Sequence, residues 1–120
     1  EADARDLVRD GCGCGSDVAG RRSTLEATKV FLEAKVSFGP GKASNAGGVS
    51  TSQLEMSQNA SMQQWSFADV DAKLKTIMKG IFTNASETAK DFKQPGNLVL
   101  GANIAGFRKV ADTMISLGVY

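Results

Sequence analysis

The run of small, polar and cationic residues from Gly39 to Ser52 is the part of this sequence best suited to bind a ligand. It contains four glycines and Pro40, and it opens into a long helical pattern. The first turn of a helix carries unpaired backbone N–H groups and the positive end of the helix dipole. Gly47 and Gly48 would let a carboxylate or phosphate approach those groups closely, and Lys42 adds a positive charge nearby. The pattern therefore predicts an anion site at this helix start.

Three side chains in this run could recognise a ligand. Asn45 supplies both a hydrogen-bond donor and an acceptor, as recognition of a carboxamide or of hydroxyls requires. Val49 and Ser52 lie three residues apart, so they share one face of a helix that begins near Gly47. A neutral hydroxyl beside a helix N-terminus suits a carboxylate ligand. Spacing alone leaves open an ordinary loop and helix cap, in which Ser52 only bonds its own backbone.

Three segments resemble a known family. They are Phe38–Asn59 (FGPGKASNAGGVSTSQLEMSQN), Gly101–Met114 (GANIAGFRKVADTM) and, more weakly, Ser23–Thr28 (STLEAT). Together they resemble the hexameric glutamate dehydrogenases of the Glu/Leu/Phe/Val dehydrogenase family, especially the NADP-dependent branch. Their order and spacing fit the C-terminal portion of such an enzyme.

The resemblance implies a reaction and a set of binding residues. Members of the family interconvert L-glutamate and 2-oxoglutarate plus ammonia, passing a hydride to a nicotinamide cofactor. By position, Asn45 would contact the nicotinamide carboxamide, with Gly47 beside the cofactor. Val49 would line the pocket for the amino-acid side chain, and Ser52 would bond the distal carboxylate of glutamate.

The same resemblance places the catalytic residues elsewhere. The family's substrate-binding lysines, its proton-transferring aspartate and its nucleotide fingerprint lie upstream, so we expect no catalytic residue in this chain and no activity from it alone. We expect NADP as the cofactor, with NAD as the alternative, and a homo-hexamer for the full-length protein. Two rivals stay open: a dehydrogenase of Leu, Phe or Val, and a non-enzymatic module in which the helix after Ser66 docks a partner.

One segment departs from the family pattern. Where the family reads Glu-Gly-Ala-Asn-Met-Pro, residues 17–22 read Asp-Val-Ala-Gly-Arg-Arg. Gly20 stands in the place of the asparagine that helps to hold the cofactor, so we carry no cofactor role onto it. An altered cofactor geometry, a paralogue without activity and a sequence error confined to this segment are three explanations that the sequence leaves open.

Composition and charge exclude several classes of protein. The 120 residues carry a net charge of +1 and are 42% hydrophobic, so nothing indicates nucleic-acid or membrane binding. No signal peptide is visible and the chain starts as if mid-protein, so we expect thiols at Cys12 and Cys14 and a cytoplasmic or organellar location. Two cysteines without histidine are too few for a zinc site, so we expect no metal. Gly13 and Gly15 could begin a dinucleotide fingerprint of the form G-x-G-x-x-G. Val18 stands where its third glycine would be, so we reject that motif.

Hydrophobic spacing predicts an α/β fold that ends in helices. A helix over 2–10, a short strand near Cys14, a helix capped by Ser23 with Glu26 and a strand over 36–38 are typical of the last units of a Rossmann-like nucleotide-binding domain. Ligands bind at the carboxyl ends of such strands. We therefore assign residues 1–44 to the end of that domain and residues 45–120 to a helical segment that lines the cleft.

Three long helices are expected in that segment, over about 47–64, from Ser66 to about 93, and from about 98 to 117, and they should return toward the missing N-terminal domain. The last one should place its apolar residues inward: Leu100, Ile104, Phe107, Val110, Ala111, Met114 and Leu117. Its small residues predict a close helix crossing around Gly106.

Overall fold

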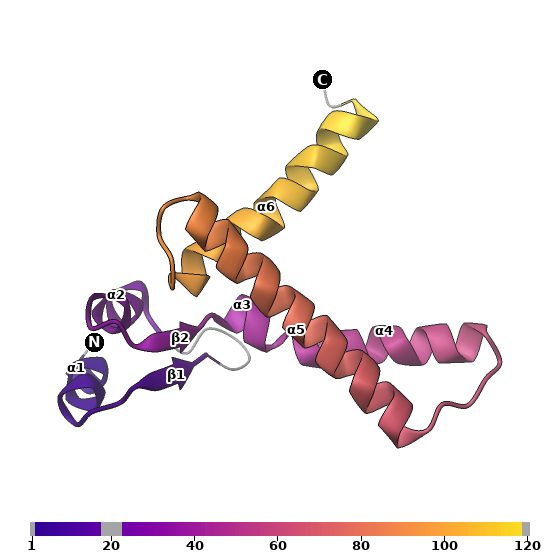
Figure 1. Ribbon diagram of the computed structural model, residues 1–120, viewed down its shortest axis with the longest axis horizontal. Helices are drawn as coiled ribbons and strands as arrows, with labels where there is room; N and C mark the ends of the chain where they lie inside the picture. Colours follow the sequence, from indigo (N-terminus) through magenta and orange to yellow (C-terminus); the bar gives the residue numbers. More distant parts are fainter. Residues whose placement is uncertain (1, 18–22, 119–120) are drawn as a thin grey trace.

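The computed structural model describes residues 2–17 and 23–118, which form a mostly helical chain with one short parallel sheet (Figure 1). The elements in chain order are α1 (Ala2–Arg9), β1 (Cys14–Ser16), α2 (Leu25–Glu33), β2 (Ser37–Gly39), α3 (Gly41–Ser44), α4 (Ala46–Ala60), α5 (Phe67–Asp91) and α6 (Leu98–Leu117). Each expected helix and strand is found within a few residues of its predicted place. The additional element is α3, which occupies part of the run predicted to be a loop.

The sheet pairs β1 with β2 in parallel, and α2 connects them. Cys14 lies opposite Ser37, and Ser16 lies opposite Gly39. Both strands therefore end at the same edge, and the chain leaves that edge toward α3 and α4. This is the arrangement in which the sequence predicted the ligand-binding run to follow a strand's carboxyl end.

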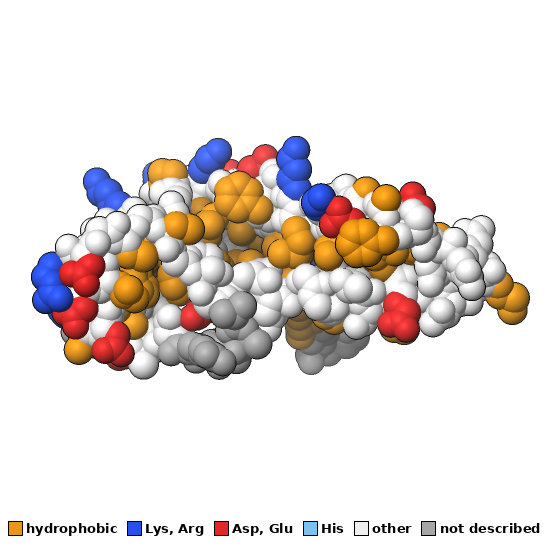
Figure 2. Space-filling model, turned by 90° about the horizontal axis from the view of Figure 1, so that it is seen from below, with side chains coloured by type: hydrophobic (Ala, Val, Ile, Leu, Met, Phe, Trp, Pro, Cys, Tyr) orange, Lys and Arg blue, Asp and Glu red, His pale blue; other side chains and the backbone are white. Residues whose placement is uncertain are grey.

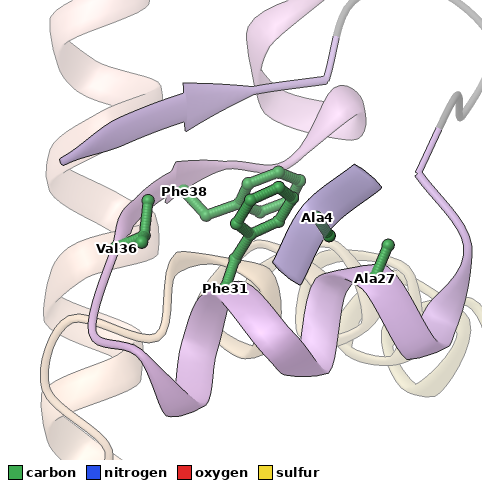
Figure 3. Close-up of a cluster of buried hydrophobic side chains, with 5 residues drawn as sticks. All are labelled: Ala4, Ala27, Phe31, Val36 and Phe38. Carbon is green, nitrogen blue, oxygen red and sulfur yellow. The ribbon is translucent and has the colours of Figure 1, made fainter. Parts of the chain in front are cut away.

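A small apolar core lies between α1, α2 and the sheet. The rings of Phe31 on α2 and Phe38 on β2 stack with centroids 5.3 Å apart and an interplanar angle of 14° (Figure 3). Ala4, Ala27 and Val36 complete the buried cluster. Because stacked aromatic rings bury large areas, this pair anchors α2 against β2.

The cap of α2 differs from the expected one. Thr24, not Ser23, is the N-cap residue, and its hydroxyl accepts a hydrogen bond from the N–H of Ala27 at 3.2 Å. Ser23 instead donates its hydroxyl to the carboxylate of Asp17 at 2.7 Å. The prediction of Ser23 as the cap was wrong, because the helix begins one residue later, after Thr24.

The crossing of α5 and α6 is centred on Gly101 rather than on Gly106. A Cβ atom added at Gly101 would overlap the carbonyl oxygen of Ala85 and lie 3.2 Å from the Cβ of Ala89, whereas one added at Gly106 would meet nothing within 4 Å. Sequence spacing could not distinguish the two glycines, since both lie in the same small-residue stretch of α6. The close approach occurs one turn into the helix.

The N-terminus of α5 is capped by Ser66, the residue at which the sequence predicted this helix to begin. Ser66 accepts a hydrogen bond from the N–H of Asp69 at 3.2 Å, and the Asp69 carboxylate accepts one from the Ser66 N–H at 3.2 Å. This reciprocal pair is a capping box. It fixes the start of the longest helix.

The far half of α6 has no partner among the described residues. It projects away from the rest of the chain (Figure 1), and the expectation that its apolar residues point inward is wrong for Phe107, Val110, Met114 and Leu117, which are exposed. Figure 2, which views the molecule from below Figure 1, shows further hydrophobic side chains open to solvent in the middle of that face. The radius of gyration is 17.2 Å, above the value of about 14 Å typical of a compact domain of this length. The described chain is therefore extended and not compact. In the described ranges, no helix has the length and apolar character that crossing a membrane requires.

Candidate functional site

The predicted binding run forms a short helix followed at once by a longer one. Pro40 precedes α3, and Asn45 is the only residue between α3 and α4. Its backbone is helical, with φ −81° and ψ −5°, and its N–H donates to the carbonyl of Gly41 at 3.0 Å. Helix α4 therefore begins at Ala46 after a helical turn instead of an open loop. The anion site inferred from an open helix end stays a prediction, with a weaker geometric basis.

The side chain of Asn45 is free to meet a ligand. It is exposed and does not cap α4, and it forms no hydrogen bond with any residue in the described ranges. Asn often serves as a helix cap, so a free carboxamide at an N-cap position is unusual. The geometry leaves one donor and one acceptor available at the carboxyl edge of the sheet.

The two glycines that follow are not required by the packing of the described chain. A Cβ added at Gly48 would meet nothing within 4 Å, and one added at Gly47 would lie 3.7 Å from the Sδ of Met78, an ordinary contact. Neither glycine has a positive φ. Packing within the described chain therefore does not explain the cost of about 1 kcal/mol that each glycine carries in a helix relative to alanine.

One face of α4 presents the other two predicted residues to solvent. Val49 is 69% exposed, and Ser52 is exposed one turn further along the helix. The Ser52 hydroxyl lies 3.4 Å from the carbonyl oxygen of Gly48, which is long for a hydroxyl hydrogen bond. This contact matches the alternative in which Ser52 bonds its own backbone, but it is too long to hold the hydroxyl there. Asn45, Val49 and Ser52 thus follow one another from the start of α4 along its first two turns.

Lys42 points toward α6 in this structure. Its Nζ donates to the Oδ1 of Asn103 at 2.8 Å, so the ammonium joins α3 to α6. Sequence reasoning missed Asn103 as a partner, because the two residues lie 61 positions apart and no local pattern connects them.

A cavity of about 320 Å³ opens at the carboxyl edge of the sheet. Polar residues in its lining include Asp17, Ser23, Thr24, Lys42 and Asn103. Asp17 is buried, and the sequence signal that could have identified it is its place directly after a strand that ends at the ligand-binding edge. Asn45, Val49 and Ser52 do not line this cavity, so the predicted site residues form a separate, open surface.

Two other features lie apart from this surface. Of the segment that departs from the family pattern, only Asp17 is described, and Gly20 with the rest of residues 18–22 falls outside the described residues. Cys12 and Cys14 carry free thiols near the start of β1, at the opposite edge of the sheet. Where the chain is described, no group of three or more His, Cys, Asp or Glu residues is arranged to hold a metal ion.

Comparison with known proteins confirms the resemblance seen in the sequence. The family model described as Glutamate/Leucine/Phenylalanine/Valine dehydrogenase matches residues 1–118. The NADP-specific glutamate dehydrogenase of Helicobacter pylori is 62% identical over 117 residues, 98% of this chain, and that of Giardia intestinalis is 52% identical over 116 residues, 97% of it. The crystal structure of Plasmodium falciparum glutamate dehydrogenase superposes with a TM-score of 0.94 at 42% identity, covering 99% of this chain. The chain spans about a quarter, 26%, of the length of each of these relatives.

Proposed function

Because the chain belongs to the Glutamate/Leucine/Phenylalanine/Valine dehydrogenase family, we propose that it is the C-terminal portion of a glutamate dehydrogenase. The full-length protein would carry out the reversible NADP-dependent oxidative deamination of L-glutamate to 2-oxoglutarate and ammonia. The names of its similar relatives support NADP, and a relative in Xylanibacter ruminicola described as NAD(P)-specific keeps NAD as the alternative. The assembly proposed for the full-length protein is a homo-hexamer.

In this proposal the chain supplies one wall of the cleft between two domains. Residues 1–44 would be the last strands and helices of a Rossmann-like nucleotide-binding domain, and residues 45–120 would be helices that line the cleft and return to the N-terminal domain. The β1–α2–β2 unit supports the first part, since a parallel pair joined by a helix is the repeating unit of such domains. The exposed apolar residues of α6 support the second, because a missing domain would cover them.

The observation that carries the site is the free carboxamide of Asn45 at the start of an exposed helix face. A carboxamide pairs well with another carboxamide through one donor and one acceptor, so Asn45 fits the nicotinamide of NADP. Gly47 would allow the cofactor to approach the backbone of α4 closely. When bound, NADP accepts the hydride released from the α-carbon of glutamate.

The residues of α4 would hold the substrate. Val49 would pack against the aliphatic part of glutamate, and the Ser52 hydroxyl would donate to its distal carboxylate. A neutral hydroxyl does not repel the side-chain carboxylate of glutamate. The apolar side chain of a leucine or phenylalanine substrate would give the same hydroxyl no hydrogen-bond partner. The chain holds no residue assigned to proton transfer, so we propose that it is inactive on its own.

Substitution of Ser52 tests the substrate in the full-length protein. Ser52→Ala should raise the KM for glutamate about 30-fold, because a hydrogen bond to a charged group contributes roughly 2 kcal/mol. Ser57→Ala is the matched control, since that hydroxyl lies on another face of α4 and bonds the carbonyl of Gln53 at 3.0 Å. An unchanged glutamate KM in Ser52→Ala, or a higher kcat/KM for leucine, phenylalanine or valine than for glutamate, would contradict the assignment. Full-length protein that neither binds NADPH nor turns over glutamate would favour the interaction module.

A further inference from the structure

The last residue of α3 forms a hydrogen bond that reaches across the sheet edge. The hydroxyl of Ser44 donates to the carbonyl oxygen of Asp17, the residue that follows β1, and lies 3.0 Å from the carbonyl oxygen of Pro40. Asp17 and Ser44 are 27 positions apart. The bond therefore ties the end of β1 to the residue directly before Asn45.

Asp17 is a rigid attachment point. Its N–H donates to the carbonyl of Gly39 at 2.9 Å, and its carboxylate accepts hydrogen bonds from the N–H and hydroxyl of Ser23 at 3.2 Å and 2.7 Å. It is only 8% exposed. A Cβ added at Gly41 would lie 3.2 Å from the Cβ of Asp17, so α3 approaches this residue closely.

Helix α3 depends on such contacts for its placement. With four residues it is too short to be stable by its own backbone hydrogen bonds. On one side Ser44 joins it to the end of β1, and on the other Lys42 joins it to Asn103 of α6. The Ser44 bond is half-buried, whereas the Lys42 bond is exposed and competes with water. The Ser44 bond is therefore the one that sets the direction in which Asn45 leaves α3.

We propose that Ser44 is a positioning residue for the nicotinamide site. Its hydroxyl fixes the end of α3 and so sets, before the cofactor binds, the backbone position from which the Asn45 side chain leaves α3. The inference rests on the proposed contact between Asn45 and nicotinamide, and Ser44 itself touches neither cofactor nor substrate. Without the hydroxyl, Asn45 must be ordered at the moment of binding. The dissociation constant for NADPH should then rise about fivefold, the lower end of the range expected for ordering the backbone of one residue.

The test is a double-mutant cycle in the full-length protein, read by NADPH fluorescence titration. Ser44→Ala and Asn45→Ala should each weaken NADPH binding, and Ser44→Ala should add nothing in the Asn45→Ala background, because it acts through Asn45. The kcat of Ser44→Ala at saturating NADP should stay near the wild-type value, since uniform binding is what is lost. Ser57→Ala, which removes a hydroxyl elsewhere on α4, should bind NADPH as the wild type does.

Two results would overturn the inference while leaving the proposed function intact. The first is wild-type NADPH affinity in Ser44→Ala beside weakened binding in Asn45→Ala. The second is a Ser44→Ala effect that persists in full in the Asn45→Ala background, which would indicate a general structural role. Wild-type affinity in Asn45→Ala would instead remove the proposed contact with the cofactor, and this inference with it.

Discussion

Replacing Gly101 by alanine tests the helix crossing that holds α5 against α6. The new Cβ would overlap the carbonyl oxygen of Ala85 and lie 2.8 Å from its carbonyl carbon. Both are backbone atoms, so no side chain can rotate away and the two helices must separate. Such overpacking costs about 1–3 kcal/mol, and backbone overlap places Gly101→Ala at the upper end of that range. Alanine regains about 1 kcal/mol of helix propensity, which leaves a net loss of about 2 kcal/mol.

The matched control for this substitution lies in the same helix. Gly106→Ala gains the same helix propensity but meets nothing within 4 Å, so in the described chain it should stabilise by up to about 1 kcal/mol. Urea unfolding of the full-length protein, followed by circular dichroism, should show a lower midpoint for Gly101→Ala and an equal or higher midpoint for Gly106→Ala. Equal stabilisation by both substitutions would refute the crossing at Gly101.

Two further predictions concern the cap of α5 and the core. The hydrogen bonds from Ser66 lower the pKa of the Asp69 carboxyl below its ordinary value of 3.8, so they stabilise the folded state above pH 3.8 and this contribution disappears as the pH falls through the lowered pKa. The stability deficit of Asp69→Asn, measured by urea unfolding, should therefore be larger at pH 7 than at pH 3, and an equal deficit at both would contradict the assignment. Phe31→Ala should destabilise by about 3–5 kcal/mol because it removes one ring of the buried pair with Phe38, while Phe31→Leu should lose clearly less; equal losses in thermal unfolding would mean that the stacked pair does not hold α2 to β2.

Local patterns in the sequence predicted most of the fold. Ser66 and the helical spacing after it predicted α5, and the alternation of helix and strand predicted an α/β arrangement in which β1 and β2 pair in parallel. These features depend on residues a few positions apart. Ser23, predicted as the cap of α2, instead donates its hydroxyl to Asp17, which lies outside the local motif, and Thr24 caps the helix.

Contacts between distant segments could not be predicted in the same way. The close crossing lies at Gly101 instead of Gly106, and which glycine faces Ala85 depends on how two helices are oriented in space. The hydrogen bond between Lys42 and Asn103 likewise joins residues 61 positions apart, so it depends on how distant segments are oriented in space. The exposure of α6 could not be predicted for a different reason. The spacing of its hydrophobic residues identifies an apolar face but does not show what that face packs against.

At the candidate site, the sequence identified residue types and order, and the structure added their availability. Asn45 was singled out for its donor and acceptor, and its side chain proves to be unpaired among the described residues. The short helix before it was missed because two glycines and a proline in a row of six residues are typical of a loop. That helix is what connects Asn45 to Asp17 through Ser44.

Helix α6 crosses α5 near its N-terminal end, so a small rotation at the crossing produces a large displacement at its C-terminal end. From Gly101 to Leu117 the helix runs about 24 Å at 1.5 Å per residue. A rotation of about 5° at the contact with Ala85 would displace the far tip by roughly 2 Å, more than the half-ångström tolerance within which binding groups must be held. The missing side chain at Gly101 thus lets a minor repacking between two helices become a sizeable shift at whatever surface the tip of α6 meets.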